Sequence, residues 1–361
     1  MKLKDTNLYY IGGVVRDEIL GLPSFDIDYC YEGNAIEFAK TNNLNIIKEN
    51  PDFGTIRIQT ENDTIDIAST RCETYPHLAH LPVVNNIGCS LKEDLSRRDF
   101  TINAMAKNTL NNNIVDYFKG LEDLKNKKLR VLHNKSFIED PSRIIRGLKF
   151  SVRFNFELEE NTRKLQETYL KNVNYDQSYH RLKKELKETF NLNSEKAFNE
   201  FIEQQIYKLL KDSIEPPKQN ENIENLVTTY RPKHTWLIYL GCFDLSNFEL
   251  TTDESNIVEC FNNIKNIIPK NNFETYKMFN KIPLESILLY CKFVNKEIGL
   301  NYLEDLSKIK ISVNGDDLIQ LGLKQGEIFK EVFDFVLKYK IDNPHITKAE
   351  ELNLIKEHYK C

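Results

Sequence analysis

The sequence lacks the features that mark several special classes of protein. It has no Cys-x-x-Cys pair, and its seven cysteines are scattered and odd in number, so neither a structural zinc site nor a disulfide framework is expected. No stretch reaches the roughly 20 consecutive apolar residues of a membrane-spanning helix, and the opening residues do not resemble a secretory signal. The cysteines are Cys30, Cys72, Cys89, Cys242, Cys260, Cys291 and Cys361. These absences predict a soluble protein of the reducing cytoplasm.

An excess of basic residues is also missing. Lysine and arginine together number 49 against 54 aspartates and glutamates, which gives a formal net charge of -5. This balance argues against a general nucleic-acid binder, because such proteins tend to be basic, although a local basic face remains compatible with it. The chain of 361 residues is long enough for two or more domains, each with its own core.

The first informative stretch begins at residue 8. Leu8–Ile11 favours a strand, Gly12 and Gly13 follow it, and residues 14–20 have the pattern of a short helix. Paired glycines let a backbone approach a ligand closely, and a helix start offers free N–H groups to a phosphate. Arg16 adds a positive charge in the first turn of this helix. The stretch therefore predicts a phosphate cradle.

Two carboxylates, Asp26 and Asp28, come next in an apolar stretch that favours a strand. Because side chains alternate between the faces of a strand, both carboxylates point the same way. Two neighbouring anions repel each other unless a cation lies between them, and Mg²⁺ prefers carboxylate oxygens together with substrate phosphates. Asp66 alternates with Ile65 and Ile67 and is placed to be a third carboxylate. For all three aspartates, an ordinary solvated strand edge is the alternative.

Paired glycines, a short helix and Asp-x-Asp, in this order, resemble the nucleotidyltransferase signature of the DNA polymerase beta superfamily. The longer string GGVVRDEILGLPSFDIDY is similar to the first motif of the class II tRNA nucleotidyltransferases and bacterial poly(A) polymerases. The resemblance implies that Asp26 and Asp28 hold Mg²⁺ and that Asp66 joins them as a catalytic carboxylate. It also implies that Gly12, Gly13 and the nearby arginine bind nucleotide phosphates.

A second motif lies at residues 90–105. Ser90 and Glu93 form a capping box that starts a helix, and the string RRDFTINAMA that follows resembles the second motif of the same family. The resemblance implies that arginine contacts the triphosphate, which guanidinium suits through paired charge-assisted hydrogen bonds, and that aspartate reads the ribose. The nucleotide-binding residues expected here are Arg97, Arg98, Asp99 and Asn103. The preceding residues, 71–88, read as a long loop, which the resemblance implies is flexible and assists the change from C to A addition.

A third nucleotide-binding region is expected at residues 139–150. Asp140 is a good N-cap and Pro141 a favoured first helical residue, so helix capping is one interpretation of this aspartate. The string also resembles the family's Glu-Asp-x-x-Arg motif, in which aspartate and arginine bind the base edge of incoming CTP or ATP. A carboxylate accepts from the amino group that both bases carry, and a guanidinium donates to the ring. Asp140, Arg143 and Arg146 are the residues expected to bind the nucleotide here.

The expected fold is α+β, with a nucleotidyltransferase α/β head of the polymerase beta type followed by an elongated all-helical remainder. The expected parts are a head over residues 1–125, a neck with the base-selecting motif over 126–190, a helical body over 191–305 and a helical tail over 306–361. Ser178 is expected to cap a neck helix, in which Arg181 and Glu185 brace the neck. Lysines make the tail locally basic and predict a tRNA contact: Lys308, Lys310, Lys324, Lys330, Lys338, Lys340 and Lys348.

The function implied by the resemblance is an enzyme that adds CCA to the 3′ end of tRNA. It would take CTP and ATP, use no nucleic-acid template and release pyrophosphate. Enzymes that add only A or only CC, and a poly(A) polymerase, are open alternatives. A non-catalytic RNA-binding relative is the alternative from another class, against which the intact Asp26 and Asp28 argue. The implied partners are tRNA, CTP, ATP and Mg²⁺, with no membrane, and the sequence predicts no oligomeric state.

Overall fold

The computed structural model describes residues 3–24, 27–61, 63–192 and 194–360. The chain divides into two compact units, residues 1–215 with 245–249 and residues 216–244 with 250–361. The boundary falls beside Pro216 and Pro217, in the polar stretch that follows the motif-rich part of the sequence. Within the described ranges, the structure contains no helix that is both long and apolar enough to cross a membrane.

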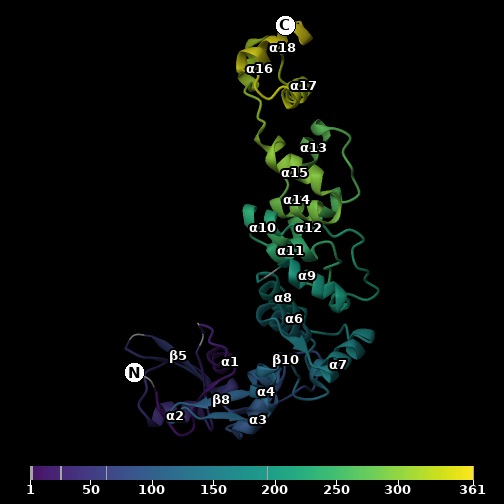
Figure 1. Ribbon diagram of the computed structural model, residues 1–361. Helices are drawn as coiled ribbons and strands as arrows, with labels where there is room; N and C mark the ends of the chain where they lie inside the picture. The colour runs from purple at the N-terminus through teal and green to yellow at the C-terminus, as the bar shows by residue number, and fades with distance from the viewer. Residues whose placement is uncertain (1–2, 25–26, 62, 193, 361) are drawn as a thin grey trace. The chain divides into compact units, whose positions relative to one another are not determined.

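The first unit is built on a mixed sheet (Figure 1). Among the described residues, seven strands form it in the order β3-β4-β5-β2-β1-β8-β9. Their bounds are β1 Leu8–Ile11, β2 Asp28–Tyr31, β3 Ile46–Asn50, β4 Thr55–Gln59, β5 Thr64–Ser69, β8 Met105–Asn108 and β9 Ile114–Asp116. Strands β2 and β5 run parallel, whereas the other neighbours are antiparallel. Because β2 and β5 run parallel, their first residues lie beside each other at the same end of the sheet.

Alternate residues of the central strands enter two separate apolar clusters. Leu8 and Tyr29 pack with α2 (Ala35–Thr41), whereas Ile11 and Cys30 pack with α3 (Leu91–Ser96). Successive side chains of a strand point to opposite faces, so the two helices cover opposite faces of the sheet. The capping box predicted for α3 at Ser90 is confirmed.

Further helices and two small ladders complete the first unit. The remaining helices are α1 Gly13–Ile19, α4 Gly120–Lys125, α5 Ser136–Glu139, α6 Ser142–Phe154, α7 Glu160–Lys171, α8 Tyr179–Phe190 and α9 Ser194–Glu203, with 3₁₀ turns η1 Pro51–Phe53, η2 Thr101–Asn103 and η3 Ile206–Leu209. The ladders pair β6 Arg71–Thr74 with β7 Val83–Ile87, and β10 Lys128–Leu129 with β11 Glu157–Leu158. Helices α6 and α8 bury regularly spaced apolar residues such as Ile144, Leu148, Leu182 and Leu186.

The second unit contains helices and no strand among its described residues. Its elements are α10 Glu224–Tyr230, α11 Thr235–Leu240, α12 Thr252–Ile264, α13 Asn272–Phe279, α14 Leu284–Phe293, α15 Lys296–Glu304, η4 Leu306–Lys308, α16 Gly315–Gln320, α17 Glu327–Asp342 and α18 Lys348–Tyr359. Val313, Leu318, Val332 and Ile355 form a small apolar cluster near its C-terminal end. The expected order of a head with a sheet followed by helices is confirmed.

Three local expectations were wrong. Residues 71–88 are not a continuous loop, because β6 and β7 pair as an antiparallel hairpin and leave residues 75–82 as its tip. Ser178 precedes α8, but its side chain forms no capping hydrogen bond, and its backbone N–H donates to the hairpin tip. Lys340 is buried in an ion pair with Glu351, so its charge is not available at a tail surface.

Gly120 begins α4 where two backbone segments approach closely. A Cβ at this position would lie 2.4 Å from the backbone oxygen of Thr101 and 2.9 Å from the side chain of Met105. We therefore expect Gly120→Ala to lower the free energy of unfolding of the first unit by about 3 kcal/mol, because the segments must move apart. Gly13→Ala is the control, since its Cβ would meet Arg16 at an ordinary 3.5 Å. Equal denaturation midpoints for the two variants would contradict this packing.

Candidate active site

One cleft of the first unit is lined by every described residue that the sequence assigned to a site. The residues are Gly12, Gly13, Arg16, Asp28, Asp66, Arg97, Arg98, Asp99, Asn103, Asp140, Arg143 and Arg146. Asp26 lies outside the described residues. The cleft measures about 940 Å³, which is at the upper end of the roughly 300–1,000 Å³ typical of small-molecule sites. Separate sequence motifs therefore converge on a space of suitable size for a nucleotide.

Two carboxylates lie side by side at one edge of this cleft. Asp28 begins β2 and is paired with Asp66 on the parallel strand β5, so their side chains project from the same face of the sheet. Arg57 donates from Nε and Nη2 to the two Asp66 carboxylate oxygens, at 2.7 and 2.6 Å. These hydrogen bonds hold the pKa of Asp66 below its ordinary value. The sheet edge therefore presents an ionised carboxylate beside Asp28.

The turn between β1 and α1 lies against Arg98. Gly12 has a φ of 71°, and a Cβ on it would lie 2.9 Å from Arg98 Nη1, so glycine is what lets the guanidinium approach the turn. Arg98 donates from Nη2 to Asp94 at 3.2 Å, whereas its buried Nε has no hydrogen-bond partner in the described part of the chain. An unsatisfied buried donor is costly unless a ligand accepts from it. The turn and Arg98 thus form a corner with an unsatisfied N–H donor, to which a bound anion would supply the acceptor.

Arg16 is held inside the fold. Its Nε donates to Asp17 Oδ1 at 2.8 Å and its Nη1 to Asn103 Oδ1 at 2.6 Å. Its guanidinium also lies over the rings of Phe150 and Phe154 in α6. Arg16 therefore ties α1, which starts at the glycine turn, to η2 and to α6.

Asp99 continues this polar network. Its Oδ1 accepts from the Phe100 backbone N–H at 2.7 Å and from Asn103 Nδ2 at 3.0 Å, and its Oδ2 lies 2.6 Å from Arg146 Nη2. Burial alone would raise the pKa of Asp99, but Arg146 and the two donors hold it below its ordinary value. Asp99 is thus a buried, ionised carboxylate. A ribose hydroxyl that donated to it would share its oxygens with these partners.

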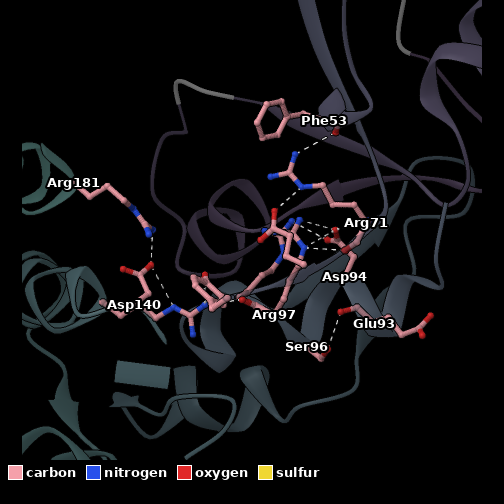
Figure 2. Close-up of polar contacts among 12 residues, drawn as sticks. Phe53, Arg71, Glu93, Asp94, Ser96, Arg97, Asp140 and Arg181 are labelled. Carbon is pink, nitrogen blue, oxygen red and sulfur yellow. Dashed lines mark hydrogen bonds and ion pairs between the residues drawn. The ribbon is translucent and has the colours of Figure 1, made fainter. Parts of the chain in front are cut away.

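Arg71, Asp94 and Arg97 join β6 to α3 (Figure 2). Asp94 Oδ1 accepts from Arg97 Nη2 at 2.6 Å and from the Arg71 backbone N–H at 3.1 Å. Glu73 accepts from Arg71 Nε at 2.7 Å and lies 2.9 Å from Arg97 Nη1. Asp94 and Glu73 therefore hold Arg97 firmly, whereas the Nε of the neighbouring Arg98 has no hydrogen-bond partner among the described residues.

We expect Asp94→Asn to lower the free energy of unfolding by about 3 kcal/mol, because it leaves two arginines facing an uncharged group. Burial alone would raise the pKa of Asp94, but Arg98 and Arg97 hold it below its ordinary value. A depressed folded-state pKa stabilises the protein above about pH 4, and that contribution is lost as the pH falls further. Urea denaturation between pH 3 and 7 measures both effects. If the free energy of unfolding of the variant fell below about pH 4 as steeply as that of the unaltered protein, this assignment would be contradicted.

Asp140 lies between α6 and α8. Its Oδ1 accepts from the backbone N–H and the hydroxyl of Ser142, at 3.1 and 2.5 Å. The expected N-cap position was wrong, because Pro141 is the N-cap of α6 and Asp140 is instead the C-cap of α5. Its Oδ2 accepts from Arg181 Nη2 at 2.5 Å (Figure 2). Asp140 is 4% exposed, whereas the Arg181 side chain is 25% exposed. A base that reaches this carboxylate therefore meets Arg181 as well.

Arg143 projects from α6 toward the hairpin. Its Nη1 donates to Ser136 Oγ at 2.7 Å, and its Nη2 donates to the Arg97 backbone oxygen at 2.8 Å and to the Tyr75 hydroxyl at 3.4 Å. These contacts fix the plane of the guanidinium at the cleft wall. A base edge would have to share or replace some of these donors.

The hairpin tip is attached to the neighbouring helices. Ala79 donates its N–H to the Glu139 backbone oxygen and accepts from the Ser178 N–H, both at 3.0 Å. Arg181 Nη1 donates to the His80 backbone oxygen at 3.3 Å. Arg181 thus contacts both the tip and Asp140, the expected base-reading carboxylate.

Sequence reasoning missed several residues that line this cleft. Arg71, Glu73 and Tyr75 line it with Asp94, yet none was assigned to the site, and Arg181 was assigned only to bracing the neck. The spacing of Arg71, Glu73 and Tyr75 is the period of two that a strand gives. Reading residues 71–75 as a strand would have placed the three side chains on one face.

The carboxylate edge fits Mg²⁺. Asp28 and Asp66 are exposed at the cleft, and Mg²⁺ is usually bound by one or two carboxylates together with substrate phosphates. Asp28 and Asp66 are the described carboxylates that would hold the ion at this edge, together with Asp26 as the sequence predicts.

Residues 8–130 match a known domain family, the poly A polymerase head domain. An A-adding tRNA nucleotidyltransferase of Aquifex aeolicus is 33% identical over 93% of this chain, which spans 45% of that relative's length. An A-adding tRNA nucleotidyltransferase of Halalkalibacterium halodurans is 30% identical over 90% of this chain and 82% of its own length. A CCA-adding enzyme of Enterococcus faecalis is 37% identical, but over 43% of this chain and 38% of its own length.

Solved structures agree with these relatives. The Thermotoga maritima CCA-adding enzyme complexed with tRNA has a TM-score of 0.75 at 26% identity, covering 98% of this chain and 91% of that structure. A CCA-adding enzyme in complex with ATP has a TM-score of 0.78 at 26% identity, covering 98% and 90%. The chain belongs to the tRNA nucleotidyltransferase family, whose head domain is that of the poly(A) polymerases.

Proposed function

We propose that this protein adds AMP to the 3′ end of tRNA, using ATP and no nucleic-acid template. The observation that carries the proposal is the convergence of three groups of residues in one cleft. These are the carboxylate edge at Asp28, the anion-binding corner at Gly12 and Arg98, and the base-reading pair Asp140 and Arg143. Transfer of a nucleotide requires a place for the metal, the triphosphate and the base.

In the proposed reaction, the 3′ oxygen of tRNA forms a bond with the α-phosphorus of ATP, and the bond to the leaving pyrophosphate breaks. Arg98 would donate to the triphosphate through its free Nε, and the backbone at Gly12 and Gly13 would approach it closely. Asp99 would accept from the ribose hydroxyl, while Asp140 would accept from the adenine amino group. Mg²⁺, when bound at the carboxylates, would supply charge stabilisation and a lower pKa for the attacking hydroxyl.

Addition of CMP as well, and hence of the whole CCA end, is the second candidate. It is the function expected from the sequence, and the similarity to CCA-adding enzymes bound to ATP and to CTP supports it. The two whole-chain relatives named A-adding support addition of A alone. Cytosine and adenine both carry the amino group that Asp140 would read, so this residue does not decide between them.

Three tRNA substrates distinguish these functions. The purified protein is given tRNA that lacks CCA, tRNA that ends in CC, and complete tRNA, each with ATP, CTP, UTP or GTP and Mg²⁺. We expect AMP incorporation on the tRNA ending in CC and none on complete tRNA. Incorporation of CMP on the shortest tRNA would establish the second candidate. No incorporation on any substrate, or long A tails on complete tRNA, would contradict the proposal.

We propose the division into a head over 1–125, a neck over 126–190, a body over 191–305 and a tail over 306–361. The exposed tail lysines, without Lys340, are proposed to contact tRNA. Because tRNA and nucleoside triphosphates meet in the cytoplasm, we propose that the protein acts there.

A further inference from the structure

Two cysteines and a glutamate lie close together in and beside β6 and α3, the two elements next to the cleft residues Arg71 and Arg97. The thiol sulfurs of Cys72 and Cys89 and a carboxylate oxygen of Glu93 all lie within 4.8 Å of one another. No short-range motif indicates this group, because Cys72 and Cys89 are 17 positions apart and form no Cys-x-x-Cys pair. The pairing of β6 with β7 brings them together.

The fold fixes all three residues in place. Cys72 lies in β6 opposite Asn86 of β7, and the Cys89 backbone oxygen accepts from Thr70 Oγ1 at 2.6 Å. Glu93 belongs to the capping box of α3, in which its Oε2 accepts from the Ser90 backbone and hydroxyl. Both bonds end on one carboxylate oxygen, so the other oxygen is available to a ligand. The group is therefore positioned by contacts that do not depend on an ion.

The chemistry of the group suits a thiophilic divalent cation. Zinc bonds to cysteine sulfur and carboxylate oxygen at about 2.0–2.3 Å, so neighbouring ligand atoms around it lie roughly 3.5 Å apart. Atoms already within 4.8 Å need only small rotations to close around the ion.

We propose that Cys72, Cys89 and Glu93 form a zinc site with a fourth position for water. On binding, the two thiols release two protons and their sulfurs bond to Zn²⁺, with no change of oxidation state. This site would take a different ion from the carboxylate edge, because Mg²⁺ prefers oxygen ligands whereas thiolates select zinc.

The position of the site gives it a structural role. Arg71 and Glu73 line the cleft, whereas Cys72 between them does not, as expected for alternate residues of a strand. The Glu93 side chain points away from the cluster of Asp94 and Arg97 (Figure 2). A bound ion would therefore connect β6, the end of β7 and α3 on the side that faces away from the cleft. It would fix the positions of the segments that carry the cleft arginines.

Cobalt titration tests the site independently of catalysis. The reduced full-length protein, freed of metal, is titrated with Co²⁺ and then with Zn²⁺. We expect one equivalent of Co²⁺ to produce thiolate-to-cobalt absorption that Zn²⁺ abolishes. Cobalt bound by the cleft carboxylates alone gives no such absorption, and the variants of Cys72 and Cys89 distinguish the proposed site from the Cys30 thiol that lines the cleft. We also expect Zn²⁺ to slow alkylation of Cys72 and Cys89 at least about tenfold, because metal-bound thiolates are shielded, and to leave Cys260 unaffected.

Substitutions assign the ligands. Cys72→Ser and Cys89→Ser should each abolish the absorption, Glu93→Gln should weaken it, and Cys260→Ser in the second unit should retain it. Melting curves identify any variant that fails to fold, in which case the other two ligand variants and the alkylation experiment still decide. Absence of thiolate absorption in the unaltered protein, or its persistence in both cysteine variants, would overturn the proposal.

Discussion

Asp28→Asn is expected to lower the rate of AMP incorporation by about 10³-fold, which corresponds to roughly 4 kcal/mol of transition-state stabilisation. Asp28 lies beside Asp66 at the cleft edge, where the negative charge of two carboxylates would hold Mg²⁺ against the triphosphate. Asparagine keeps the size of the side chain but removes its charge. The measurement is the initial rate on tRNA ending in CC at saturating ATP.

The binding of tRNA separates loss of catalysis from loss of folding. We expect Asp28→Asn to bind tRNA with unchanged affinity in a filter-binding assay, because a single cleft carboxylate contributes little to phosphate-backbone contacts. Asp52→Asn is the control, since Asp52 is exposed in η1 and does not line the cleft. The sequence makes the same prediction for Asp26→Ala as for Asp28→Asn. A rate within about twofold of the unaltered protein would contradict the role of Asp28, because a lost charge in such a site costs far more.

Asp140→Asn is expected to lower kcat/KM for ATP by about 10²-fold and to raise the relative use of UTP. The carboxylate only accepts hydrogen bonds, whereas an amide can also donate to the carbonyl oxygen that uracil carries in place of the amino group. The loss corresponds to roughly 3 kcal/mol, the upper range for a hydrogen bond to a charged group. Competition between ATP and UTP on tRNA ending in CC measures the change.

Two further variants show whether the effect is on the base or on the fold. Ser142→Ala removes the hydroxyl contact at Asp140 Oδ1, and Arg181→Lys alters the donor at Oδ2. We expect Ser142→Ala to change stability with little change in base preference, and Arg181→Lys to change base preference. If Asp140→Asn lowered the use of ATP, CTP and UTP by the same factor, the residue would only position α6.

Much of the cleft was predictable because the chemistry is local in the sequence. A glycine turn, a pair of arginines or an aspartate before a proline each has its own short-range signal, and the resemblance supplied their roles. Gly12, Arg98 and Asp140 were named on those grounds, and the fold brings all three to one cleft. The helix start at Ser90 was predictable in the same way, since a capping box is complete within four residues.

The partners of these residues could not be predicted, because they depend on long-range pairing. Asp94 and Glu73 hold Arg97 only because β6 lies beside α3. Residues 71–74 contain few apolar side chains and therefore read as a loop, whereas in the fold they form a strand whose polar residues face the cleft. Cys72 and Cys89 meet for the same reason, through a hairpin that the sequence did not reveal.

Anomalous diffraction from crystals of the protein with Mn²⁺ and a non-hydrolysable ATP analogue tests the central claim most directly. We expect an anomalous peak about 2.1 Å from a carboxylate oxygen of Asp28, the distance at which such cations bind oxygen, with the triphosphate between that ion and Arg98. A nucleotide bound elsewhere, or an ion with no contact to Asp28, would contradict the assignment of this cleft.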